Sequence, residues 1–98
     1  MKEVDTIITN QSEFLKYLKS RFTLIHRSNI FFRDFHYGVM GYLAGHGIKT
    51  GYGKSEKVAR EIASEFEKNG TLKKIDHQSW LLEYPEFALP RPEGPVKA

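Results

Sequence analysis

The segment SEKVAREIASEFEKNG, residues 55–70, constrains the fold of this chain more than any other part of it. Its apolar side chains recur at helical spacing along one face: Val58, Ala59, Ile62, Ala63 and Phe66. Ser55 is a suitable N-cap at its start, and Asn69-Gly70 is a typical helix stop. We therefore expect a helix between these residues and a fold that covers its apolar face.

Two upstream segments also show helical spacing. SEFLKYLKSRF begins with Ser12 as an N-cap and places apolar residues on one side: Phe14, Leu15, Leu18 and Phe22. IFFRDFHYGVMGYLAGHG, residues 30–47, follows a cap at Ser28-Asn29 and ends at Gly47. Between the two helices, FTLIH at residues 22–26 is apolar and rich in β-branched residues. It could continue the first helix or form a short strand, and we favour the strand.

The remaining segments differ in character. TLKKIDHQSWLLEY, residues 71–84, contains two β-like runs around the turn at 76–79 and predicts a hairpin. Residues 1–10 show no periodicity, and we expect an irregular leader there. All four prolines lie beyond Tyr84, so residues 85–98 are predicted to be an extended, proline-rich tail.

This order of helix, strand, helix, helix and hairpin resembles the winged-helix domain superfamily. The resemblance covers residues 11–84 and is carried by REIASEFEKNGTLKKI, residues 60–75, followed by Trp80. It implies a single α+β domain over residues 1–84, with three helices, a C-terminal hairpin as the wing, and the third helix presented outward. The expected core is Phe14, Leu18, Phe22, Phe31, Phe35, Val39, Leu43, Val58, Ile62, Phe66, Leu72, Trp80 and Leu82.

Composition excludes several functions. A chain of 98 residues without cysteine has one core and no disulfides, thiolate metal sites or thiol nucleophiles. The start of the chain has no long apolar run, so we expect a cytoplasmic protein without a membrane partner. No His-x-x-x-His pair and no nucleophile–base set occur, which predicts no metal, no cofactor and no small-molecule substrate. The protein is not expected to be an enzyme.

The stretch GHGIKTGYGKSEK, residues 45–57, has the appearance of a phosphate-binding loop. That motif places a glycine five residues before the Gly-Lys-Ser at 53–55, but this position is occupied by Ile48. The nearest glycine, Gly47, comes one residue too early. The nucleotide-binding interpretation therefore fails. A weaker anion site remains, because glycines and a lysine precede a predicted helix N-terminus: Gly51, Gly53, Lys54 and Ser55. The alternative is a flexible connection with an ordinary cap, which we favour.

The outward face of the third predicted helix bears on nucleic-acid binding. Together with the wing, it offers six candidate contacts: Lys57, Arg60, Ser64, Lys68, Lys73 and Lys74. Between Glu56 and Lys68, however, four acidic residues oppose three basic ones, and the wing tip has no lysine or arginine. The connection between the second and third helices is also longer than a helix-turn-helix turn. A solvated face is therefore favoured over a DNA-reading one.

Two features suggest contact with a protein partner. Gly38, Gly41 and Gly45 form a strip on the second helix that allows another backbone to approach closely. That backbone belongs either to this chain, which we favour, or to a partner. In the tail, Phe87 and Leu89 could dock into a partner's groove, or pack back on the domain. The leading functional hypothesis is therefore a small non-catalytic module for protein interaction or assembly, with a homodimer as one form. The alternative is a DNA-binding winged-helix protein.

Overall fold

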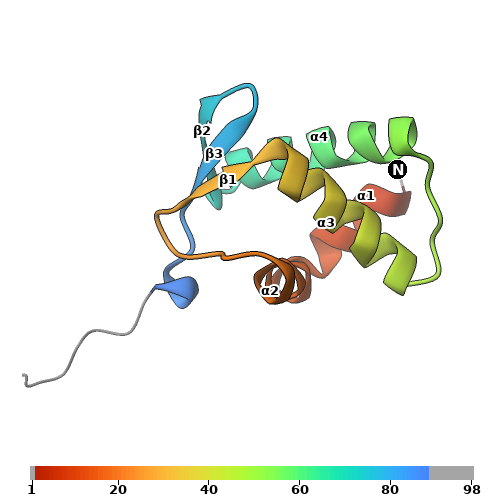
Figure 1. The fold of residues 1–98 in the computed structure, drawn as a ribbon, viewed down its shortest axis with the longest axis horizontal. Helices are drawn as coiled ribbons and strands as arrows, with labels where there is room; N and C mark the ends of the chain where they lie inside the picture. Colours follow the sequence, from red (N-terminus) through yellow and green to blue (C-terminus); the bar gives the residue numbers. More distant parts are fainter. Residues whose placement is uncertain (1, 89–98) are drawn as a thin grey trace, which may run out of the picture.

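A computed structural model describes residues 2–88 of the chain (Figure 1). Over that range it contains α-helices followed by an antiparallel sheet near the C-terminus, which confirms the α+β class. The elements are α1 Lys2–Thr9, α2 Gln11–Arg21, β1 Asn29–Phe31, α3 Phe32–Gly45, α4 Tyr52–Lys68, β2 Leu72–Asp76, β3 Ser79–Leu82 and the 3-10 turn η1 Pro85–Phe87.

The sheet has three strands in the order β1-β3-β2, so the predicted hairpin is joined by a strand from before α3. Ile30 pairs with Trp80, which in turn pairs with Lys74. Because side chains alternate along a strand, Ile30 and Trp80 point into the core while Phe31 points out and is 55% exposed. The prediction of Phe31 in the core is therefore wrong.

The strand prediction for residues 22–26 is also wrong, because the strand begins at Asn29 and the following helix at Phe32. Residues 22–26 form neither helix nor strand. The amide of His26 instead donates to the carbonyl of Phe87. Pairing with β3, about fifty residues further along the chain, holds residues 29–31 in extended form, and no local pattern reports such a partner.

Residues 2–9 are a helix, not the predicted irregular leader. Val4 and Ile7 lie on its inner face and are buried. Packing of α1 against α4 supplies this helix with the apolar contact that a segment of eight residues needs to persist. The ion pair between Glu3 and Lys54, with 2.9 Å between Oε2 and Nζ, joins the same two helices.

The core is built around Phe14 of α2. Its ring contacts Phe35 and Tyr42 of α3 edge to face, with centroid distances of 5.8 and 5.3 Å, and Phe66 of α4 at 6.1 Å. Of the predicted core residues, all are buried except the exposed Phe31 and Phe22, which is half-buried. The three central helices are thus held by one aromatic cluster.

Two glycines of α3 lie where α2 crosses it. A Cβ atom at Gly38 would overlap the side chain of Leu18, and one at Gly41 would overlap the hydroxyl of Tyr17. Gly45 has nothing near the position of its missing Cβ. The close approach at Gly38 and Gly41 is therefore within the chain, which is the alternative that the sequence favoured, and it is made by side chains of α2 rather than by a backbone.

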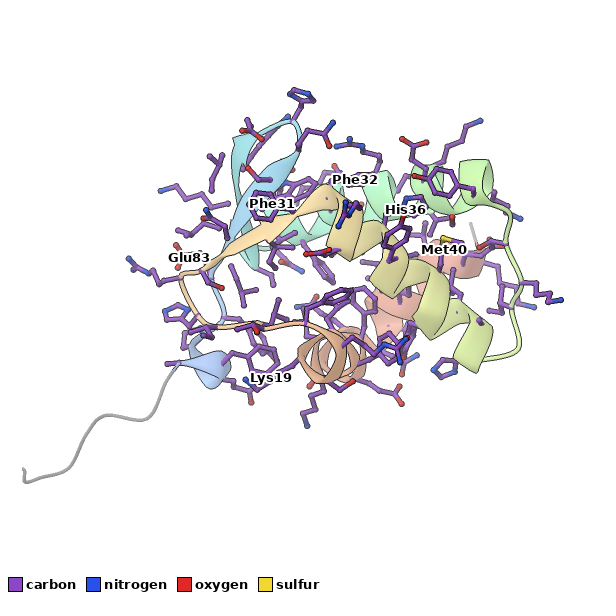
Figure 2. All side chains as sticks on the ribbon, viewed as in Figure 1. Lys19, Phe31, Phe32, His36, Met40 and Glu83 are labelled. Atoms are coloured by element: carbon purple, nitrogen blue, oxygen red, sulfur yellow. The ribbon has the colours of Figure 1, made fainter. Side chains whose placement is uncertain are left out.

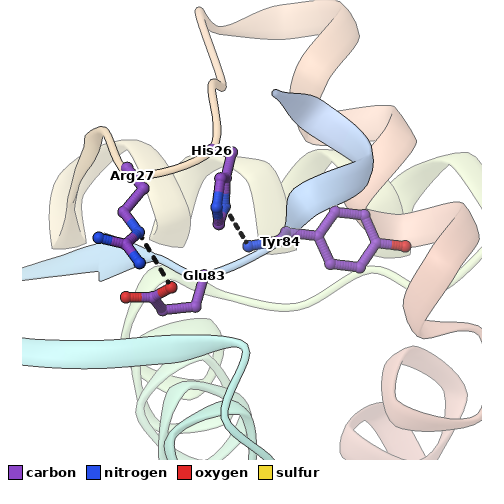
Figure 3. Close-up of polar contacts among 4 residues, drawn as sticks. All are labelled: His26, Arg27, Glu83 and Tyr84. Carbon is purple, nitrogen blue, oxygen red and sulfur yellow. Dashed lines mark hydrogen bonds and ion pairs between the residues drawn. The ribbon is translucent and has the colours of Figure 1, made fainter. Parts of the chain in front are cut away.

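The segment after β3 is bound to the loop before β1 (Figure 3). The amide of Tyr84 donates to Nδ1 of His26 at 3.0 Å, and Arg27 Nε lies 3.4 Å from Glu83 Oε1. Phe87 is buried, with its ring 4.8 Å from that of Tyr84. Residues 85–87 thus belong to the domain rather than to an extended tail, and Phe87 is not a free partner contact. Leu89 lies outside the described residues.

Substitution of the α3 glycines tests this packing. We expect Gly38→Ala to lower the free energy of unfolding by about 1–3 kcal/mol, because fully buried Leu18 has little room to move. Gly45→Ala should be neutral or raise it by up to about 1 kcal/mol. Urea denaturation of both variants measures the difference, and equal stabilities would contradict the close approach of α2.

Candidate interaction surfaces

The six residues predicted to face nucleic acid do not form one surface. Lys57, Ser64 and Lys68 are exposed on α4, on the side opposite its buried residues. Lys74 shares a sheet face with Trp80, whose indole donates to Glu67 of α4, so Lys74 lies on the α4 side. Lys73 pairs with Leu81 and points to the opposite face of the sheet. It is therefore separated from the other five.

Arg60 is committed to contacts within the chain. Its Nη1 donates to the carbonyl of His77 in the hairpin turn at 2.7 Å. Its guanidinium lies 3.7 Å from the ring centroid of Phe32, at the start of α3. Arg60 thus joins α4, α3 and the turn, and its assignment to a nucleic-acid base does not fit the hydrogen bond and stacking that it already makes.

The four residues of the predicted anion site take different places from those predicted, because α4 starts earlier than expected. The helix begins at Tyr52 with Gly51 as N-cap, one turn before the predicted start. Ser55 therefore lies inside the helix, fully buried, where its hydroxyl donates to the carbonyl of Tyr52 at 2.9 Å. Lys54 pairs with Glu3. Gly51 and Gly53 are exposed, so of the four predicted residues Ser55 and Lys54 have side chains that are already engaged within the chain.

Ser55 also meets His36, a buried histidine of α3. His36 Nε2 lies 2.7 Å from Ser55 Oγ. Because the Ser55 hydroxyl already donates to a carbonyl, the neutral imidazole donates through Nε2–H. Burial lowers the pKa of His36; the Glu56 carboxylate opposes this and the Arg60 cation adds to it. The pair links α3 to α4 and has no free nucleophile.

The outward face of α3 has no charged residue beyond its first turn. Arg33, Tyr37, Met40 and Ala44 follow at steps of four, three and four residues, which is the spacing of a helix–helix seam. Tyr37 is 48% exposed, Met40 is half-buried and Ala44 is exposed. From Tyr37 to Ile48 the sequence holds no Asp, Glu, Lys or Arg. Figure 2 shows Met40 one turn from His36 and toward α4, so Met40 lies at the edge of this face that is nearest α4.

A groove of about 360 Å³ lies beside this seam, between α2 and α3. Its lining residues are Glu13, Lys16, Tyr17, Gly41, Tyr42, Gly45 and His46. The hydroxyl of Tyr42 donates to Glu13 at 2.8 Å. Burial, with this hydrogen bond to a carboxylate, raises the pKa of Tyr42 to about 12. The groove therefore has an aromatic wall, and its floor has no side chain at Gly45, whereas the hydroxyl of Tyr17 covers Gly41.

Stability should depend on pH through His36. Its pKa is lowered in the folded chain, so between that value and the ordinary one near 6.5 the unfolded chain binds more protons. The stabilisation is complete above about pH 6.5 and is lost as the pH falls below it. We expect the melting temperature to drop between about pH 7.5 and 5.5, and to drop less in His36→Gln. Carboxylates titrate below this range. Equal drops would contradict the role of His36.

Within residues 2–88 no group of three His, Cys, Asp or Glu side chains could hold a metal ion. None of the helices described is both long enough and apolar enough to cross a membrane. No protein-family model, no curated protein and no solved structure matches this chain. Its surfaces are therefore assigned from their own geometry and charge.

Proposed function

We propose that this chain is a non-catalytic module of winged-helix type that binds another protein through the outward face of α3. The topology supports the winged-helix part of the proposal: α2, β1, α3, α4 and the β2–β3 hairpin follow in the order that the resemblance implies, with β1 beside β3. In this arrangement α1 is an addition that packs against α4.

The observation that carries the proposal is the uncharged face of α3. Helix surfaces of monomeric proteins are normally rich in charge, whereas here Tyr37, Met40 and Ala44 are exposed or half-exposed in a run without any charged residue. Aromatic residues and methionine are enriched in protein interfaces, and charged residues are depleted at their centres. Tyr52, which is 60% exposed and whose ring lies 4.6 Å from that of His36, extends the same surface onto α4.

The face of α4 fits nucleic acid less well. Arg60 is engaged by the hairpin turn and by Phe32, and Lys68 lies 3.6 Å from Glu65. Four glutamates are interspersed among the basic residues of this helix. A DNA-binding surface needs an excess of positive charge to displace counterions from the phosphates, and this face has none.

The α3 face is tested by a substitution that leaves folding intact. Ala44→Arg places a large cation on an exposed position near a helix C-terminus, where it suits the helix dipole. We expect this variant to lose the proteins that immobilised wild-type chain captures from a lysate. Ser64→Arg, at an exposed position of α4, is the matched control and should capture them unchanged. If both variants capture the same proteins as wild type, the α3 face is not the binding surface.

DNA binding is a second candidate because Lys57 and Lys68 are exposed on α4 and Lys74 lies on the sheet face that meets this helix. Each phosphate contact contributes about −0.9 to the slope of log K against log salt, so these three lysines predict a slope no steeper than about −3. Fluorescence anisotropy with a random duplex, at about 50 and 200 mM salt, measures it. If α3 is the binding surface, we expect no specific binding of the duplex. The double variant Lys57→Glu with Lys68→Glu should then give the same anisotropy as wild type. Micromolar binding that this double variant abolishes would favour DNA.

A further inference from the structure

We infer that the partner on the α3 face is a second copy of this chain, joined by an antiparallel pair of α3 helices about a two-fold axis. The inference rests on the proposed function, since it names the partner of the same surface. A two-fold contact must be self-complementary: where residue i meets residue j, residue j also meets residue i. The seam of α3 satisfies this condition in size and in charge.

In size, a large side chain falls opposite a small one. An axis passing between residues 40 and 41 places Tyr37 opposite Ala44 of the second copy. This contact then occurs twice, once on each side of the axis. Tyr37 is the exposed knob of such a pair, and the positions opposite it carry a methyl group or no side chain at all.

The groove between α2 and α3 provides the matching hole. It lies beside Ala44, and its floor is open at Gly45, whereas the hydroxyl of Tyr17 covers Gly41. Its volume of about 360 Å³ and its aromatic wall, formed by Tyr17 and Tyr42, suit an aromatic side chain. Tyr37 of the second copy would enter the groove of the first copy. By symmetry, Tyr37 of the first copy would enter the groove of the second.

In charge, the seam is complementary only when the helices run antiparallel. Arg33 stands in the first turn of α3 and is exposed. The antiparallel pair brings it to the C-terminal end of the second α3, where the helix dipole is negative and Glu13 lines the groove. A parallel pair would bring the two Arg33 cations together. Residues 37–48 bury no charge in either case.

The expected affinity is modest. A helix of 14 residues is about 21 Å long, and its seam covers less surface than the roughly 800 Å² per partner of a standard interface. The dissociation constant should therefore be on the order of micromolar or weaker. Sedimentation equilibrium at increasing protein concentration measures it. Ala44→Arg should weaken association at least about tenfold, while Ser64→Arg should leave it unchanged.

Disulfide trapping tests the orientation, because the chain has no cysteine of its own. Under mild oxidation, a mixture of Tyr37→Cys and Ala44→Cys should cross-link several-fold more than either variant alone. In that mixed dimer one Tyr37 still meets one Ala44. Tyr37→Cys mixed with Ser64→Cys gives the background. Cross-linking of each variant with itself, without enrichment in the mixture, would overturn the antiparallel pair.

Outcomes of these measurements separate the partner from the proposed function. A chain that stays monomeric at millimolar concentration, but loses a captured protein through Ala44→Arg, has a different protein on this face; that result overturns self-association alone. A monomeric chain with no effect of Ala44→Arg on capture overturns both. A dimer that Ala44→Arg leaves intact would also overturn this pairing, since it uses another surface.

Discussion

The contact of the Phe14 ring with three other aromatic rings is the interaction on which the rest of the structure depends. It joins α2 to Phe35 and Tyr42 of α3 and to Phe66 of α4 in one buried cluster. Once these helices are fixed, Gly38 can accept the side chain of Leu18, and the start of α3 is held where β1 meets β3. The sheet, the hairpin turn and the exposed surfaces all take their positions from this arrangement.

Elements with a local signal were predictable, and those that depend on distant partners were not. The helical spacing of apolar residues in α4 and the turn of the hairpin are each contained in a segment of about fifteen residues. Because these signals are local, the sequence predicts both elements nearly correctly. β1 exists because Ile30 meets Trp80, and α1 because Val4 and Ile7 meet α4. The same limit applies to the surfaces, since no pattern indicated that Ser55 would be buried against His36.

Helix α3 shows how one element serves two purposes. One face supplies aromatic rings to the core, and the opposite face leaves Tyr37 and Ala44 at the surface in a stretch that has no charged residue after the first turn. The glycine strip has a mixed origin as well, because Gly38 and Gly41 lie under side chains of α2, whereas within residues 2–88 nothing lies near the missing Cβ of Gly45. Meanwhile the basic residues of α4 are balanced by glutamates, and Arg60 is used to hold the hairpin turn. Protein contact through α3 is the proposal that these features support together.

The position of β1 has a consequence for how the chain folds. This strand precedes α3, whereas its partner β3 follows α4. Ile30 and Trp80 can therefore pair only when the chain that contains both intervening helices has folded back on itself. The entropy of closing a loop of about fifty residues is lost at that step, whereas the contacts between successive helices close much shorter loops. We therefore expect the pairing of β1 with β3 to form last during folding. The earlier contacts between successive helices shorten the loop that this pairing has to close.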